Sequence, residues 1–260
     1  MRLRIDARLD YQFDAPADVL LALEVAQLPD QRLISDELTV TSPEPLVPMP
    51  GEQSIGQRTW AAAAAGQFLA IYQAEVQIDR PAVDLGSIAA VPLRSLAGLV
   101  VPYLWPSRYC RSDKHREFAV QTFGHLSGGA LATAIAGWCR DNLAYTPGSS
   151  DEETSSVETF LERRGMCRDY AHLAISFARA LGVPARMVSA YAWNLDPPDF
   201  HAVVEVYLDG GWYLLDPTGL APTEGLVRIG IGRDAADISF MSIFGAARLN
   251  AQSVAVERID

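Results

Sequence analysis

A cysteine, a histidine and an aspartate in the second half of the chain have the residue types that thiol chemistry needs. Cys167 stands where a helix is expected to begin, two residues after Gly165 in the stretch RGMCRDYAHL. Unpaired N–H groups and the positive end of the helix dipole at such a position favour a thiolate over a thiol. Taken alone, however, a cysteine is more often a small buried hydrophobic residue than a nucleophile. The assignment therefore depends on whether a base and an orienting carboxylate lie beside it.

His201 and Asp216 supply those two groups if the strands that carry them pair in the right register. His201 begins one predicted strand and Asp216 directly follows the next. If the turn within 209–211 has two residues, His201 lies opposite Thr218 or Leu220, and Asp216 then points to the same side of the sheet. A three-residue loop without a bulge would place the two side chains on opposite faces. The parity of this hairpin decides whether a Cys-His-Asp group forms.

The strand of His201 also indicates which side of the sheet packs against the cysteine helix. One face of this strand is entirely apolar, and it consists of Ala202, Val204, Val206 and Leu208. This face suits packing against the helix, whereas the face of His201 is mixed. His172 is nearest to Cys167 in the sequence, but five positions turn it about 140° around the helix. We therefore expect His172 to pack elsewhere and His201 to serve the thiol.

The elements around these residues predict an α+β domain. Apolar spacing and breaks at glycine or proline predict three helices, at 129–145, about 156–163 and 167–181. Three strands follow, at 185–193, 201–208 and 212–215, with the last two joined as a hairpin. Helices followed by an antiparallel sheet indicate an α+β fold rather than alternating βαβ units.

The first third of the chain predicts a β-rich domain. Charged and apolar residues alternate from Leu3 to Asp10, which is typical of a half-buried strand. Further strands are expected near 19–27, 32–41, 57–65 and 68–78, with the spacing of an antiparallel β-sandwich. A proline-rich stretch follows, where the pattern changes. The predicted division is a β-rich domain at 1–88, a linker at 89–120 and a catalytic domain at 121–260.

Composition excludes several classes of partner. The 260 residues are 49% hydrophobic and carry a formal net charge of -11, which is typical of a globular chain and disfavours nucleic acid and anionic membranes. The longest apolar run is interrupted and much shorter than a membrane span. The beginning, MRLRIDARLDYQFDAP, lacks the apolar block of a secretion signal, so we expect a cytoplasmic location.

The cysteines do not indicate a disulfide framework or a zinc site. Cys110, Cys139 and Cys167 are odd in number, widely spaced and without a CxxC pair. No carboxylate loop of the kind that binds calcium stands out. We therefore expect reduced thiols, and neither a metal nor a cofactor.

The sequence resembles the bacterial branch of the transglutaminase-like superfamily. The similarity runs from about 131 to 237 and includes RRGMCRDYAHL at 163–173, HAVVEVY at 201–207, GWYLLDPT at 211–218 and GRDAAD at 232–237. The first 85 or so residues resemble, more weakly, the β-rich domain that accompanies these proteins. The resemblance implies a papain/transglutaminase-like catalytic domain in which Cys167 is the nucleophile, His201 the base and acid, and Asp216 the residue that orients His201.

Two features of the site are left open by the resemblance. The family usually has an aromatic residue two positions after the histidine, and Val203 occupies that position here. The second donor to an oxyanion varies in the family, and Tyr145 and Trp138 are candidates that are at least as often core residues.

The function expected from these residues is hydrolysis of peptide or isopeptide bonds through a thioester, by a cysteine peptidase or amidase acting on peptides or proteins. The same three residues perform transamidation of protein glutamine if an amine replaces water. Acyl transfer from acyl-coenzyme A also fits the triad, but the absence of a phosphate-binding loop or basic patch disfavours it. A non-catalytic binding module is the remaining alternative, and the intact triad argues against it.

Overall fold

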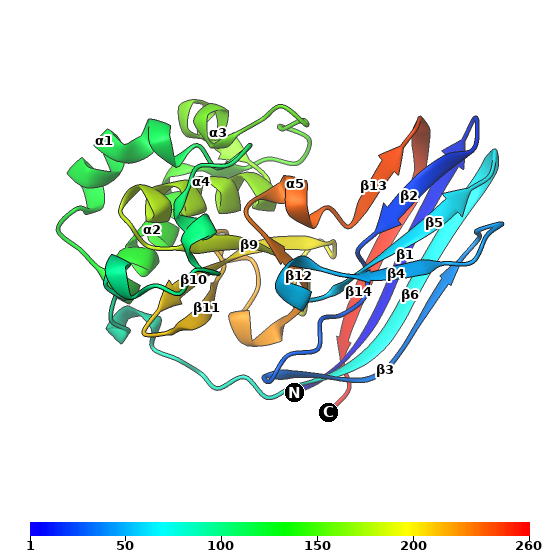
Figure 1. The fold of residues 1–260 in the computed structure, drawn as a ribbon, viewed down its shortest axis with the longest axis horizontal. Coiled ribbons are helices and arrows are strands. Elements are labelled where there is room, and N and C mark those ends of the chain that lie inside the picture. The colour runs from blue at the N-terminus through cyan, green and yellow to red at the C-terminus, as the bar shows by residue number, and fades with distance from the viewer.

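Strands from both ends of the chain build one lobe of the protein, and helices with a smaller sheet build the other (Figure 1). The computed structural model describes residues 1–260. The strands of the first lobe are β1 (Arg2–Phe13), β2 (Ala17–Leu21), β3 (Gln31–Val40), β4 (Val47–Pro50), β5 (Gln57–Ala63), β6 (Gly66–Ile78), β13 (Met241–Phe244) and β14 (Ala247–Arg258). They form two four-stranded sheets, in the orders β14-β1-β6-β3 and β13-β2-β5-β4.

The core of the first lobe follows the period-two pattern of the sequence. In β1, Leu3, Ile5, Ala7 and Leu9 are fully buried, and the charged residues between them point away from the core. The alanine-rich segment within 57–63 is strand β5, not helix, because every second residue packs into the sandwich. The predicted β-rich amino-terminal region is confirmed.

The last two strands differ from the predicted domain division. The sequence analysis placed 241–258 in the second domain, within 121–260, but β14 pairs with β1 and β13 pairs with β2. Both chain ends therefore lie together on the first lobe (Figure 1), where the amino group of Met1 is 3.6 Å from the Asp260 carboxylate. Alternation of apolar and polar residues identifies a strand but not the strand with which it pairs. The sequence therefore contained no signal that β13 and β14 return to the first lobe.

The second lobe has helices packed on one face of an antiparallel sheet. Its main helices are α1 (Ser112–Phe123), α2 (Gly128–Asn142), α3 (Ser156–Glu162) and α4 (Cys167–Ala180), with the single turn α5 (Ala235–Ile238) near the lobe junction. The sheet has the order β11-β10-β9-β12, from β9 (Ala185–Ala192), β10 (His201–Leu208), β11 (Gly211–Leu215) and β12 (Leu226–Gly232). Two short strands, β7 (Ala144–Tyr145) and β8 (Arg164–Gly165), pair in parallel before α4. The expected α+β arrangement is confirmed.

Helix α4 is the central element of this lobe. Every residue from Asp169 to Ala180 is buried, and its apolar residues share one core with Val204, Val206 and Leu208 of β10. This is the strand face that the sequence indicated for the helix. Helix α1 also packs on α4, although 112–120 lies in the predicted linker. The sequence did not predict α1, because its buried residues include polar ones such as His115 and therefore show no clear apolar spacing.

A buried charge cluster joins the lobes. Glu205 on β10 is fully buried and accepts hydrogen bonds from Arg186 on β9 at 2.7 Å and Arg228 on β12 at 2.8 Å. Arg228 also pairs with Asp30 of the first lobe. The Gln31 side chain then bonds the backbone N–H and carbonyl of Arg228, each at 2.8 Å. The sheet is thus tied to the first lobe through β12.

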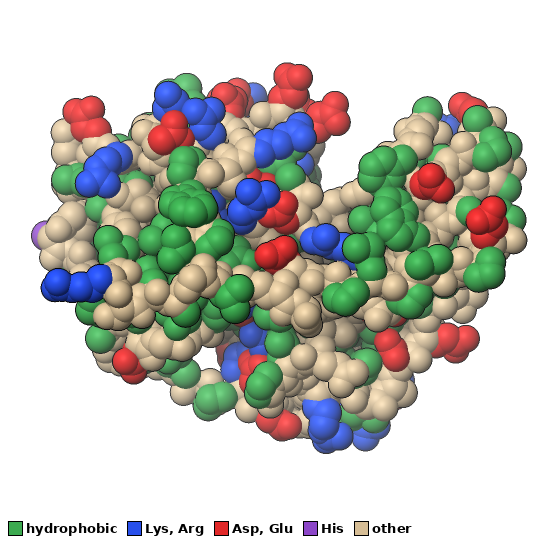
Figure 2. Space-filling view, in the orientation of Figure 1, with side chains coloured by type: hydrophobic (Ala, Val, Ile, Leu, Met, Phe, Trp, Pro, Cys, Tyr) green, Lys and Arg blue, Asp and Glu red, His purple; other side chains and the backbone are tan.

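On the face shown in Figure 2, a notch separates the two lobes, and hydrophobic side chains gather on the wall of the first lobe that borders it. The exposed apolar residues of this lobe include Val47, Met49 and Phe244. None of the helices combines the length and the apolar character that crossing a membrane requires.

Replacing Glu205 by Gln should destabilise the whole protein. The change leaves two buried guanidinium groups without their shared carboxylate, and breaking a buried pair of this kind costs about 3–5 kcal/mol. Urea unfolding followed by tryptophan fluorescence measures the loss. Glu257→Gln, at an exposed position on β14, is the matched control and should unfold like the original protein. Equal stability of the two variants would show that the cluster does not stabilise the fold.

Candidate active site

Cys167 is the first residue of α4, as the sequence predicted. The backbone that leads into α4 is held by the β7–β8 pair and by the Asp169 side chain. This side chain accepts a hydrogen bond from the Met166 N–H at 2.8 Å. Gly165 is required here, because a Cβ at that position would lie 2.6 Å from the Cβ of Asp169. Cys167 is partly exposed, so its side chain can be reached from solvent.

The other two cysteines have a different environment. Cys110 and Cys139 are buried, and burial raises the pKa of each thiol to about 12. Arg179 and Asp234 act on the Cys110 thiol and Arg140 acts on that of Cys139, but no histidine acts on either. Both pack in the core of the helical lobe, where they act as small hydrophobic residues.

The hairpin between β10 and β11 has the two-residue loop that the site needs. Leu208 pairs with Gly211, which leaves Asp209 and Gly210 as the turn. Both turn residues have positive φ, 43° and 80°, as tight hairpin loops require. The same register places Asp216 on the side of His201, and the Nε2 of His201 donates to the Oδ2 of Asp216 at 3.0 Å. The structure therefore confirms the two-residue loop that the predicted Cys-His-Asp group requires.

Asp216 is held in a fixed orientation by several donors. Its Oδ1 accepts from the N–H of Thr218 at 2.9 Å and from the hydroxyl of Thr218 at 2.7 Å, and its Oδ2 also accepts from the N–H of Ala221 at 3.1 Å. Burial alone would raise the pKa of Asp216, but the hydrogen bonds and charge of His201 and the Thr218 bonds lower it below the usual value. The side chain is therefore a carboxylate at neutral pH.

His201 lies between Asp216 and Cys167. Burial alone would lower the pKa of His201, but the hydrogen bonds to Asp216 and to the Cys167 sulfur raise it to about 10. Because Nε2 is bonded to Asp216, Nδ1 is the ring nitrogen left for the sulfur. The structure thus brings together all three residues that the sequence singled out, and it favours an imidazolium at neutral pH.

The two candidate oxyanion donors lie in different places. Tyr145 lies near Cys167, and burial followed by the charge of Cys167 raises the pKa of the Tyr145 hydroxyl. Trp138 packs instead among the aromatic rings of Phe118, Phe160 and Phe177. Of the two, only Tyr145 is a neighbour of the thiol.

His172 and Val203 are core residues. His172 is fully buried and stacks on Tyr109 with ring centroids 5.0 Å apart, and its Nε2 accepts from the N–H of Ala235 at 3.2 Å. Burial lowers the pKa of His172 well below its usual value, so it is neutral. The prediction that His172 packs away from the site is confirmed. Val203 is also fully buried, in a cluster with Val188.

Sequence reasoning missed the contribution of the first lobe. Phe200, next to His201, stacks on Phe240 at 4.1 Å between centroids and belongs to the core of the first lobe. Asp199 accepts a hydrogen bond from Gln252 on β14 at 2.6 Å. The residues before His201 are therefore anchored to the β-rich lobe, and no sequence pattern near 199–200 signals this contact.

Comparison with known proteins finds a matching family and a similar solved structure. Residues 118–217 match the family described as the transglutaminase-like superfamily. A crystal structure described as "a Putative Cysteine Protease" from Cytophaga hutchinsonii is 35% identical, with a TM-score of 0.93, and the match covers 100% of this chain and 91% of that one.

Curated relatives come from mycobacteria. An uncharacterized protein of Mycobacterium leprae is 29% identical over 81% of this chain and 68% of its own length. An uncharacterized protein of Mycobacterium tuberculosis is 30% identical over 49% of this chain, and the match spans 46% of that relative.

Iodoacetamide should alkylate Cys167 selectively in the folded protein at neutral pH. Cys110 and Cys139 are buried thiols with raised pKa values, whereas Cys167 is partly exposed and acts on the pKa of His201. Replacing His201 by Gln should slow the reaction by about tenfold or more. Peptide mapping by mass spectrometry measures both effects.

The control for this experiment is His125→Gln, at an exposed position remote from the thiol in sequence, which should leave the rate unchanged. All three cysteines should react in denaturant. Equal labelling of the three cysteines in the folded protein, or an unchanged rate in His201→Gln, would contradict the activated thiol.

Proposed function

The chain belongs to the transglutaminase-like superfamily, and on this basis we propose that it is a cysteine-dependent hydrolase of peptide or isopeptide bonds. One observation carries the proposal. His201 contacts both Cys167 and Asp216, and its pKa of about 10 makes it a proton donor at neutral pH. A partly exposed thiol beside a buried imidazolium is the arrangement that nucleophilic attack on an amide requires.

In the first step of the proposed reaction, the Cys167 sulfur attacks the amide carbon and a C–S bond forms. The carbonyl oxygen becomes negative, and the Cys167 N–H and the Tyr145 hydroxyl lie beside the thiol as its candidate hydrogen-bond donors. The C–N bond then breaks while the His201 imidazolium gives its Nδ1 proton to the leaving nitrogen. The products of this step are a free amine and a thioester on Cys167.

In the second step, neutral His201 removes a proton from water, and the water oxygen attacks the thioester carbon. The C–S bond breaks, the acyl group leaves as a carboxylic acid and the sulfur regains its negative charge. His201 ends as the imidazolium with which the cycle began. Throughout, the Asp216 carboxylate keeps Nδ1 directed at the sulfur because it holds Nε2.

A proteome-derived peptide library tests this function. The protein should generate new carboxyl termini, and Cys167→Ala should remove the activity entirely, since the thioester cannot form. Cys139→Ala is the control for replacing a cysteine and should remain active. In heavy-oxygen water, hydrolysis introduces one labelled oxygen at each new carboxylate. If label is absent and an added fluorescent primary amine is attached to glutamine instead, the reaction is transamidation; if neither occurs, the protein is a binding module.

The pH dependence of kcat/KM should have a falling limb near pH 10. His201 must be protonated to give a proton to the leaving nitrogen, and its pKa is raised to about 10, so activity is retained below this pH and lost above it. Asp216→Asn removes a hydrogen-bonded charge that raises this pKa. The limb should therefore move to lower pH, and the maximal rate should fall by about 10²-fold or more.

Asp209→Asn, in the exposed hairpin turn, is the matched control and should keep the original limb. A limb that stays near pH 10 in Asp216→Asn would mean that Asp216 does not set the protonation of His201.

A further inference from the structure

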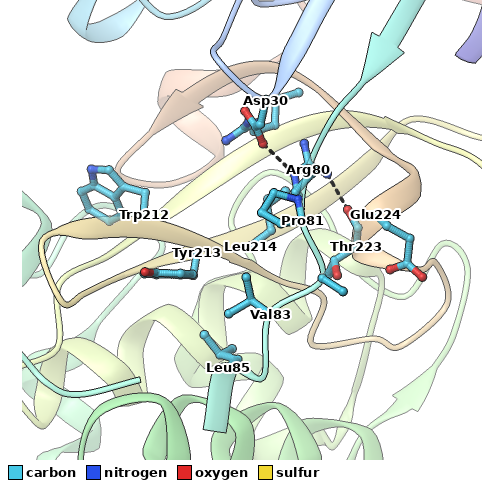
Figure 3. A pocket seen from close by; sticks show the side chains of 12 residues that line it. Asp30, Arg80, Pro81, Val83, Leu85, Trp212, Tyr213, Leu214, Thr223 and Glu224 are labelled. Atoms are coloured by element: carbon cyan, nitrogen blue, oxygen red, sulfur yellow. Dashed lines mark hydrogen bonds and ion pairs between the residues drawn. The ribbon is translucent and has the colours of Figure 1, made fainter. Parts of the chain in front are cut away.

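A cavity lies at the junction of the lobes, away from the three site residues. It has a volume of about 410 Å³, and its wall comes from the linker after β6, strand β11, the loop before β12, Arg228 of β12 and Asp30 of the first lobe (Figure 3). Trp212 of its wall pairs with Tyr207, near the end of β10 opposite to His201. Neither Cys167, His201 nor Asp216 contributes to the wall. The size is that of a pocket for a small molecule.

Two arginines form the polar side of this cavity. Arg80 donates from Nε to Asp30 at 2.7 Å and from Nη1 to the carbonyl of Thr223 at 2.6 Å, but its buried Nη2 has no partner. Arg228 is bonded to Glu205 and Asp30, and its buried Nε also has no partner. The side chain of Arg228 is only 9% exposed. Each guanidinium group therefore keeps one buried nitrogen that no protein group satisfies.

The charges of the buried ion-pair cluster to which Arg80 and Arg228 belong do not balance. Three guanidinium groups, those of Arg80, Arg186 and Arg228, share the two carboxylates of Asp30 and Glu205. Burial and the charge of Arg228 both lower the pKa of Arg80, which shows that the groups repel each other. Glu224 also reaches the cavity, but it is exposed to water and makes no ion pair. An anion placed against the arginines would offset the excess positive charge.

The other side of the cavity is apolar. It is formed by Pro81, Val83, Leu85, Trp212 and Leu214. The indole of Trp212 is held in place, since the Arg186 guanidinium lies over it at 4.0 Å and the ring of Tyr103 packs edge-on at 5.3 Å. A preformed apolar wall facing buried guanidinium groups is suited to a ligand with one charged end and one apolar end.

We propose that this cavity binds a small organic carboxylate. The carboxylate lies against Arg80 and Arg228, and the apolar body packs on Trp212 and Leu214. The site is separate from the proposed catalytic centre, and its occupancy does not depend on the reaction at Cys167.

Isothermal titration with phenylacetate and hexanoate, and with their neutral amides, tests the proposal. Phenylacetamide and hexanamide have the same shape without the charge, so at least one carboxylate should bind about tenfold or more tightly than its amide. Added salt should weaken the binding. Cys167→Ala should bind as the original protein does, because the catalytic centre is not involved. Absence of binding by both carboxylates, or equal binding of acids and amides, would overturn the proposal.

Val83→Trp locates the ligand. Val83 lines the cavity from the exposed linker, so a larger side chain fills the space without disturbing the buried ion pairs. This variant should lose carboxylate binding. Val120→Trp, at a similarly exposed position on α1, is the matched control and should keep it. Thermal melting confirms that both variants fold, and undiminished binding in folded Val83→Trp would place the carboxylate elsewhere and refute the assignment.

Discussion

The packing of α4 against one face of the small sheet fixes the geometry on which the whole site depends. The helix is buried from Asp169 onward, and its apolar residues interlock with Val204 and Val206 of β10. Its first residue, Cys167, is thereby set beside the first residue of β10, His201. A slip of one helical turn, about 5.4 Å, would remove the sulfur from reach of the imidazole. The apolar packing of α4 against β10 thus positions the Cys167 thiol and the His201 imidazole at its edge.

The β-rich lobe takes part in this positioning from the other side. Phe200 extends the chain before His201 into the core of the first lobe, and the Glu205 to Arg228 pair ties the middle of the sheet to Asp30. Strand β10 is therefore held at its start by apolar packing and at its centre by buried charge. Both ends of the chain are needed for the first lobe, since β14 pairs with β1. The geometry of the site therefore depends on both lobes and not on the second lobe alone.

Much of the site could be predicted from sequence because it depends on local rules. A helix start places Cys167, and a two-residue turn of Asp209 and Gly210 sets the register that brings Asp216 to His201. The features that sequence reasoning missed depend on contacts between distant segments. Strand β12 was not predicted, since glycines at 230 and 232 weaken its pattern, and no local rule links Phe200 to the first lobe.

The most direct test of the central claim is an NMR titration of the His201 ring in protein with isotopically labelled histidine, assigned with His201→Gln. We propose that Asp216 and the Cys167 sulfur hold this ring as an imidazolium. The account predicts a charged His201 at pH 8 and a titration near pH 10, while the buried His172 stays neutral. A His201 ring that is neutral at pH 8 and titrates near the ordinary value of 6.5 would contradict it.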